Sequence, residues 1–120
     1  MEKLLLIFML GWSAVQAPPV GWLGITVQEL TPQMAARLGV RSGDGVVVMS
    51  VQFDSPAKRG GLQEGDVITA INGRKVPDIQ TLRKEVSKTT PDTPLQVTII
   101  RERKERVLEI RVGAPPKEAA

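Results

Sequence analysis

This sequence of 120 residues contains no histidine and no cysteine, so it lacks two of the side chains that nucleophilic catalysis most often uses. A Ser-His-Asp triad or a Cys-His pair cannot be assembled from these residues. The serines have ordinary positions in expected turns, strands or helices: Ser42, Ser50, Ser55 and Ser87. No spacing matches a thiolate metal site, a calcium loop or a phosphate-binding loop. We therefore expect no catalytic residue, no metal and no cofactor.

A different chemistry is available in the segment Gly-Trp-Leu-Gly-Ile at residues 21–25. Gly24 permits a tight turn, in which the N–H groups of Leu23, Gly24 and Ile25 can converge on one anion. Charge-assisted bonds from such amides to a carboxylate are short and strong, so two or three could anchor an acidic group. The alternative interpretation of this segment is the start of a strand with a glycine bulge.

Residues 55–73, SPAKRGGLQEGDVITAING, predict a helix, a turn, a strand and a second turn. Ser55-Pro56 suits a helix start, and Gly60-Gly61 can end a short helix. Residues 67–71 form an apolar run rich in β-branched side chains, which predicts a mostly buried strand. Asn72-Gly73 favours positive φ and so a tight turn.

Together these two segments resemble a PDZ domain, in the version found in bacterial periplasmic proteases of the HtrA/Deg type. The resemblance runs from about Gly21 to Val112, and the loop precedes the longer signature, as in the bacterial (permuted) strand order. It implies an α+β fold, namely a partly open β-barrel or sandwich of about five to six strands with two helices. It also implies a PDZ domain occurring alone, without the protease domain.

A PDZ domain lets the last residues of a partner add as an extra strand to a sheet edge, and captures the terminal carboxylate on backbone amides. The resemblance assigns this capture to the loop of Trp22, Leu23, Gly24 and Ile25. Thr26 and Val27 would continue into the groove, with Ile25 and Val27 lining the pocket for the last side chain. Many animal PDZ domains have a histidine at the start of the opposite helix, and its absence here implies a groove that prefers apolar ligands. Because the loop lies at a sheet edge, Gly24→Val is expected to leave the fold largely intact.

The opposite wall of the groove should be the helix predicted for residues 79–88, capped by Asp78. Ile79, Leu82 and Val86 lie on one helical face. If all three face the core, the groove would see other side chains: Thr81, Glu85 and Lys88. Because pockets are mostly apolar, we favour Leu82 and Val86 as at least partly lining the groove.

The remaining elements follow from local patterns. Alternation predicts a strand at residues 25–30, and Thr31-Pro32 begins a helix that Gly39 ends. Residues 46–51 read as a central strand, with Val48, Ile68 and Ile71 in the core. Residues 95–100 and 107–112 alternate as a hairpin around a charged turn at residues 101–106.

The first 17 residues have the pattern of a secretory signal peptide, with an apolar run at residues 4–10 and small residues at Val15 and Ala17. The alternative is a retained membrane anchor, but the apolar run falls short of the ~20 residues that a span needs. We predict a signal peptide at 1–17, a short lead at 18–20, a PDZ domain at 21–113 and a flexible, proline-containing tail at 114–120. Export without cysteines fits a bacterial periplasm.

The net charge of +3 arises from 16 basic and 13 acidic residues, and aromatic residues make up 3%. No basic run is interleaved with aromatics, which argues against nucleic-acid binding. The leading hypothesis is a non-catalytic periplasmic module that captures C-terminal or extended apolar peptide segments, as an adaptor to a protease or secretion component. The alternative is a structural PDZ subunit of a secretion or protease assembly that binds a partner domain. An enzyme and stable membrane insertion after signal cleavage are not expected.

Overall fold

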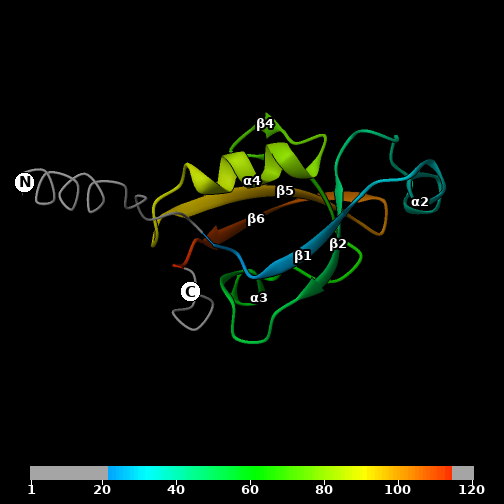
Figure 1. Ribbon diagram of the computed structural model, residues 1–120. Coiled ribbons are helices and arrows are strands. Elements are labelled where there is room, and N and C mark those ends of the chain that lie inside the picture. Colours follow the sequence, from blue (N-terminus) through cyan, green and yellow to red (C-terminus); the bar gives the residue numbers. More distant parts are fainter. Residues whose placement is uncertain (1–21, 115–120) are drawn as a thin grey trace, which may run out of the picture.

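The computed structural model describes residues 22–114 as an antiparallel sheet of six strands with three helices (Figure 1). The strands are β1 (Ile25–Glu29), β2 (Val46–Val51), β3 (Val67–Ile71), β4 (Arg74–Lys75), β5 (Pro94–Arg101) and β6 (Lys104–Arg111). The helices are α2 (Pro32–Leu38), α3 (Pro56–Arg59) and α4 (Ile79–Ser87). The strand order is β1-β2-β3-β5-β6, with β4 paired to β3. The sheet is therefore open, with β1 and β6 at its edges, which confirms the predicted partly open fold and rules out a closed barrel.

The predicted signal peptide at 1–17, the lead at 18–20 and most of the tail lie outside the described residues. Within residues 22–114, no helix is long and apolar enough to cross a membrane.

The two faces of the sheet bury separate apolar clusters. Val46 and Val48 point into a large cluster with Ile68, whereas the intervening Val47 and the neighbouring Val67 join a small cluster on the other face. This alternation is the two-residue period of β-strands. Both faces of β2 are thus covered over its first half, as predicted for a central strand.

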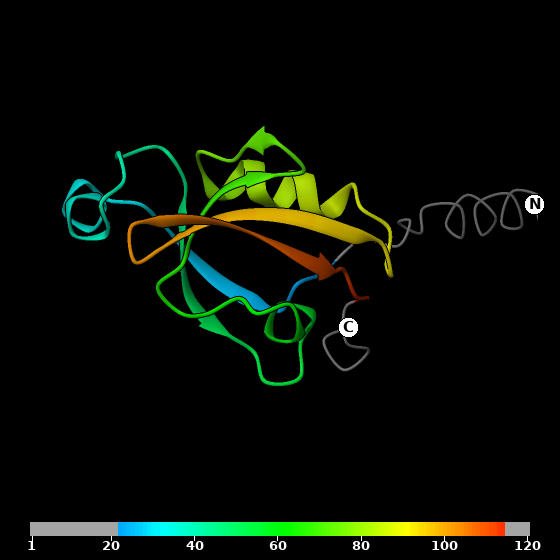
Figure 2. The same cartoon turned by 180° about the vertical axis from the view of Figure 1, so that it is seen from behind.

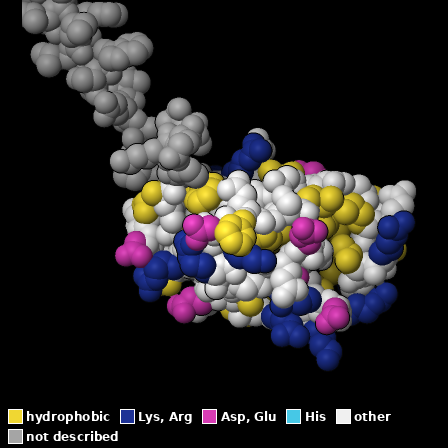
Figure 3. All heavy atoms as spheres, turned by 90° about the horizontal axis from the view of Figure 1, so that it is seen from below, with side chains coloured by type: hydrophobic (Ala, Val, Ile, Leu, Met, Phe, Trp, Pro, Cys, Tyr) yellow, Lys and Arg dark blue, Asp and Glu magenta, His cyan; other side chains and the backbone are white. Residues whose placement is uncertain are grey.

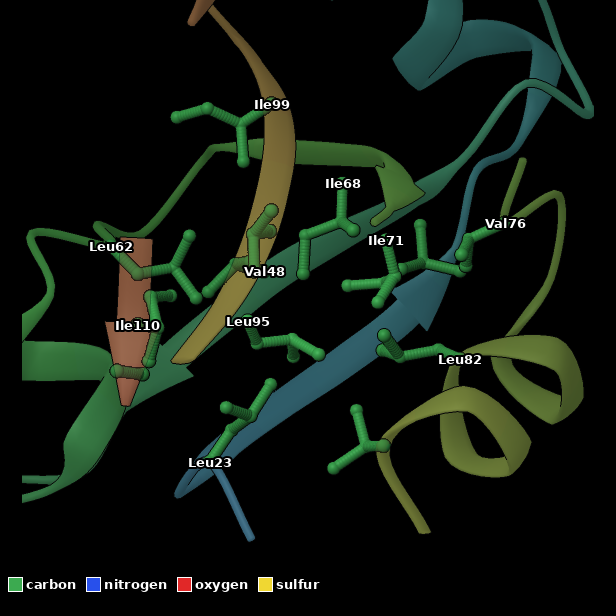
Figure 4. Close-up of a cluster of buried hydrophobic side chains, with 14 of the residues drawn as sticks. Leu23, Val48, Leu62, Ile68, Ile71, Val76, Leu82, Leu95, Ile99 and Ile110 are labelled. Carbon is green, nitrogen blue, oxygen red and sulfur yellow. The ribbon is translucent and has the colours of Figure 1, made fainter. Parts of the chain in front are cut away.

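The helices close these clusters. α3 and α4 contribute Ala57, Leu82 and Val86 to the large cluster and close it from opposite ends (Figures 1 and 2). Figure 4 shows Leu82 on α4 and Leu23, just before β1, directed into this cluster. α2 lies at one end of the sheet, where Ala35 packs in the small cluster.

Local signals set the helix ends where the sequence predicts them. The Thr31 and Asp78 side chains accept hydrogen bonds from the backbone N–H groups of Met34 (3.2 Å) and Thr81 (2.8 Å), which caps α2 and α4. The bonds from Thr81 hold the pKa of Asp78 below its usual value, the side-chain bond first and the backbone amide second. Gly39 ends α2 in the left-handed conformation with φ of 75°.

The β5–β6 hairpin differs from the prediction of a charged turn over residues 101–106. β5 continues through Arg101 and β6 begins at Lys104, so only Glu102 and Arg103 form the turn. Their φ values of 52° and 65° match a two-residue turn with the twist of the flanking strands. The prediction was wrong because a charged side chain does not take its backbone out of the ladder. Arg101 on β5 pairs with Asp66, and the charged side chains at the start of the edge strand β6 project into solvent, while their backbone stays paired.

The end of β5 is also held from the side by an ion pair. Arg101 donates to both carboxylate oxygens of Asp66, from Nε at 2.8 Å and Nη2 at 2.7 Å, and donates to Gly61 O at 2.8 Å. The hydrogen bond with Asp66 raises the pKa of Arg101 above its usual value. Such a bidentate pair ties the loop between α3 and β3 to the hairpin.

Removing the side chain of Ile71 should destabilise the fold, because this residue is 1% exposed in the large cluster. We expect Ile71→Ala to lower the free energy of unfolding by about 2–5 kcal/mol in urea denaturation. The matched control is Val107→Ala on β6, whose residue is 58% exposed and whose loss should stay below about 0.5 kcal/mol. Equal losses at the two positions would show that β3 is misplaced.

Candidate functional site

A groove of about 480 Å³ lies between the first residues of β1 and the helix α4. Its β1 side is lined by the consecutive residues Trp22, Leu23, Gly24, Ile25, Thr26 and Val27. Its α4 side is lined by Ile79, Leu82, Arg83, Val86 and Ser87. The structure thus brings together every residue predicted for the loop and for the favoured form of the groove. Their roles in binding stay predictions.

The alternative wall of Thr81 and Glu85 is not on this groove. The Glu85 carboxylate instead lies 3.9 Å from Arg74 and 3.5 Å from Lys88. Leu82 and Val86 are 4% and 9% exposed, pack in the large cluster and also line the groove. The same two side chains therefore pack in the core and line the groove, so a core-facing and a groove-facing role for Leu82 and Val86 do not exclude each other.

Sequence reasoning missed three residues of the α4 wall: Ile79, Arg83 and Ser87. They are spaced four apart, and residues with this spacing lie on one face of a helix. The signal was present, but a search for apolar groove residues passed over the two polar members of the row. Among the described residues that line the groove, Arg83 is the single charged one.

The edge of β1 is available for another strand. Within residues 22–114, β1 pairs only with β2, and the register shifts between Thr26 and Val27, so that Val27 lies opposite Val48. Val48 uses both its N–H and its C=O for bonds to Asp66 and Gly65, at 2.8 and 2.9 Å. Both backbone groups of Val48 thus point toward Gly65 and Asp66 and away from Val27, and β1, which lies at an edge of the sheet, can template an added strand.

The loop before β1 is anchored through its carbonyl oxygens. Trp22 O accepts from Gly113 N (3.0 Å), Leu23 O from Ala57 N (3.0 Å) and Gly24 O from Gln52 N (2.8 Å). The donors come from the end of the domain, from α3 and from the loop after β2. Three successive carbonyls are thus turned toward the body of the protein.

The amides that follow these carbonyls are turned the other way. In a planar trans peptide, the N–H points opposite to the C=O of the preceding residue. The N–H groups of Leu23, Gly24 and Ile25 therefore face away from the loop's protein donors. Among the bonds formed within residues 22–114, the amides of Leu23 and Gly24 have no acceptor, although both residues are buried. Because a buried amide without an acceptor is costly, these groups are suited to receive an anion.

Gly24 fits its position for two reasons. Its φ is +81°, and a Cβ at this residue would lie 2.5 Å from Cβ of Ser55. Ser55 cannot easily move, because its buried hydroxyl donates to Gln52 O at 2.8 Å and accepts from Lys58 N at 3.2 Å. This packing argues against the expectation that Gly24→Val leaves the fold largely intact, because the loop lies at a sheet edge but packs against the start of α3.

On the face seen in Figure 3, charged groups of both signs are interspersed rather than gathered into a field of one sign. Lys and Arg side chains alternate with Asp and Glu over the face seen in Figure 3. No group of acidic residues in the described region could hold a metal ion. The groove therefore offers backbone amides, apolar walls and one guanidinium.

An exposed strand edge, a helix facing it and a glycine loop at one end of the groove are features found in peptide-binding modules. The PDZ domain family model matches residues 21–112. The chain belongs to the PDZ domain family.

The relatives of this chain are proteases of the HtrA type. It is 34% identical over 99 residues to a probable periplasmic serine endoprotease, DegP-like, of Rhizobium meliloti, covering 82% of this chain and 20% of the relative. The corresponding protein of Brucella suis is 36% identical over 98 residues, covering 82% and 19%. The chain thus spans about a fifth of the length of these relatives.

Two solved structures are similar to this fold. The HtrA-type protease AlgW with a tripeptide gives a TM-score of 0.77 at 35% identity, covering 95% of this chain and 38% of that one. The HtrA3 PDZ domain bound to a phage-derived ligand, FGRWV, gives 0.66 at 29% identity, covering 79% and 86%.

Replacing Gly24 should destabilise the protein beyond the cost of its backbone conformation. A left-handed non-glycine residue costs roughly 1–2 kcal/mol, and Gly24→Ala adds the clash with Ser55. The matched control is Gly43→Ala, because Gly43 has φ of +87° and a Cβ there would meet no neighbouring atom within 4 Å. We expect a larger loss of unfolding free energy for Gly24→Ala in urea denaturation. Equal losses would show that the loop does not pack on Ser55.

Proposed function

We propose that this chain acts as a periplasmic, non-catalytic PDZ module that captures apolar C-terminal peptide ends by strand addition. The observation that carries the proposal is the set of loop amides turned away from their protein anchors, with no acceptor for Leu23 and Gly24 among the described residues. A terminal carboxylate supplies the missing acceptor, and charge-assisted bonds of this kind are strong.

The groove beside the loop suits the rest of such a ligand. An extended peptide can pair with the edge of β1, while its last side chain enters the space walled by Ile25, Leu82 and Val86. Extended residues between these two walls would gain backbone hydrogen bonds from the strand and selectivity from the pocket.

The comparisons support peptide partners. AlgW is described with a tripeptide and with a decapeptide, and the HtrA3 PDZ domain with a phage-derived peptide. The proteolytic activity of the relatives belongs to proteins about five times as long, so it is not part of this proposal. Absence of histidine and cysteine from the sequence supports a binding role.

A second candidate, docking to a partner domain as a structural subunit, has one feature in its favour. Phe53, in the loop after β2, is 91% exposed, and Met49 on β2 is 42% exposed. Exposed apolar side chains of this size can mark a protein contact. This role needs no free peptide terminus, which separates the two candidates.

Calorimetry with paired peptides distinguishes them. A peptide with an apolar last residue and a free carboxylate should bind at least tenfold more tightly than the same peptide amidated at its C-terminus. Amidation removes the charge and replaces an acceptor by a donor, and a charge-assisted bond is worth ~1.5–3 kcal/mol. The control peptide ends in aspartate, which the apolar pocket should reject. Equal affinity of the free and amidated peptides would contradict carboxylate capture.

We also propose that residues 1–17 direct export and are removed, which the apolar run at residues 4–10 and the periplasmic relatives support. Mass spectrometry of the protein from a bacterial periplasmic fraction should give a mass that begins near Pro18. A full-length mass in the membrane fraction would contradict cleavage and indicate an anchored protein.

A further inference from the structure

Arg83 is a cation on the groove wall, and no acidic side chain among the described residues forms an ion pair with it. It is exposed, lines the groove and forms no ion pair with any side chain of residues 22–114. A guanidinium stays charged and carries several N–H donors in a planar fork suited to carboxylates.

The acidic side chains on or beside α4 are engaged elsewhere. Asp78 accepts from Thr81 N (2.8 Å), Glu85 lies near Arg74 and Lys88, and Glu29 accepts from Ile79 N (3.4 Å). The basic groups of Arg74 and Lys88 have Glu85 as their partner, whereas Arg83 has no such acceptor in the described part of the chain. An acidic partner for Arg83 would therefore come from a ligand in the groove.

The direction of α4 fixes which part of a ligand passes Arg83. The bond from Ile79 N to Glu29 places the start of α4 at the far end of β1, so the helix runs back toward the loop, with Val86 and Ser87 nearest the loop residues. A peptide whose carboxylate sits in the loop, and which pairs antiparallel to β1, runs from the loop past Val86 and then Arg83. This step rests on the proposed function.

Spacing identifies the ligand residue. Arg83 lies three residues before Val86, about 4.5 Å along the helix axis. In an extended peptide, side chains on one face recur every two residues, about 6.8 Å apart. If the last side chain packs near Val86, the next on the same face belongs to the third residue from the C-terminus. The long side chain of Arg83 can bridge the remaining distance.

We propose that Arg83 makes this groove selective for peptide ends that carry an acidic side chain at the third residue from an apolar C-terminus. The proposed ligands are therefore peptides whose last three residues are, in order, an acidic residue, any residue and an apolar residue that carries the free C-terminal carboxylate. The loop amides bind the terminal carboxylate. Arg83, about one helical turn before Val86 on α4, binds the acidic side chain.

The test compares two peptides that end in valine with a free carboxylate and differ only in glutamate or glutamine at the third residue from the end. Calorimetry on the full protein at low salt should give about two- to fivefold tighter binding of the glutamate peptide, the range of an exposed ion pair. The difference should shrink at high salt, because exposed charges are screened.

Variants assign the effect to one side chain. Arg83→Gln should abolish the preference for glutamate. Lys84→Gln, which removes the same charge from an exposed neighbour that does not line the groove, should keep it. Arg83→Glu should reverse it, so that a peptide with lysine at the third residue from the end binds more tightly than the glutamate peptide. Thermal unfolding of each variant checks that the fold is retained.

The outcomes separate this inference from the function on which it rests. Equal affinities of the glutamate and glutamine peptides for the unaltered protein, or a preference that survives Arg83→Gln, would overturn the role of Arg83 alone. Failure of both peptides to bind would overturn strand addition itself, and the selectivity with it.

Discussion

The close approach of Gly24 to Ser55 is the contact on which the groove depends. Because Gly24 has no Cβ, the loop backbone can lie close to the start of α3, where Leu23 O accepts a hydrogen bond from the N–H of Ala57 at 3.0 Å. Ser55 is itself fixed by its bonds to Gln52 O and Lys58 N. The short helix α3 does not line the groove, but its Ala57 N–H holds one of the three inward carbonyls. The N–H groups of Gln52 and Gly113 hold the other two, and together these bonds turn the loop amides outward.

The groove and the core share their side chains. Leu23, Leu82 and Val86 are buried members of the large cluster, and each also lines the groove. Affinity and stability are consequently coupled, because a change that reshapes the floor of the pocket also alters core packing. Polar residues on the rim are free of this constraint. Arg83, exposed and unpaired within the described region, can set selectivity with little effect on folding.

Features encoded by neighbouring residues were predictable from the sequence. The caps at Thr31 and Asp78 and the turn at Asn72-Gly73, with φ of 50° and 81°, depend on side chains within a few positions. The core positions of Ile68 and Ile71 followed from the apolar run of β3. The resemblance to PDZ domains supplied the pairing of the loop with α4, which spacing alone does not reveal.

Features created by tertiary contact were not predictable. A Cβ at residue 24 would clash with Ser55, which is distant in sequence, and this contact is why the position requires glycine. The two-residue turn at Glu102-Arg103 depends on the full ladder between β5 and β6. Arg83 was missed for a related reason. Nothing in a helical pattern shows which polar residue beside an apolar face borders a groove, because this depends on the element packed opposite.

The central claim, that the loop amides receive a carboxylate, is tested most directly by nuclear magnetic resonance. The uniformly ¹⁵N-labelled protein is titrated with a peptide that has an apolar last residue and a free C-terminus. The account predicts that the amide protons of Leu23 and Gly24 move downfield, with the largest changes in the spectrum, because they gain a charged acceptor. Unchanged amides in this loop, with shifts confined to a separate pocket between α2 and β2 that Met34, Leu38 and Met49 line, would contradict it.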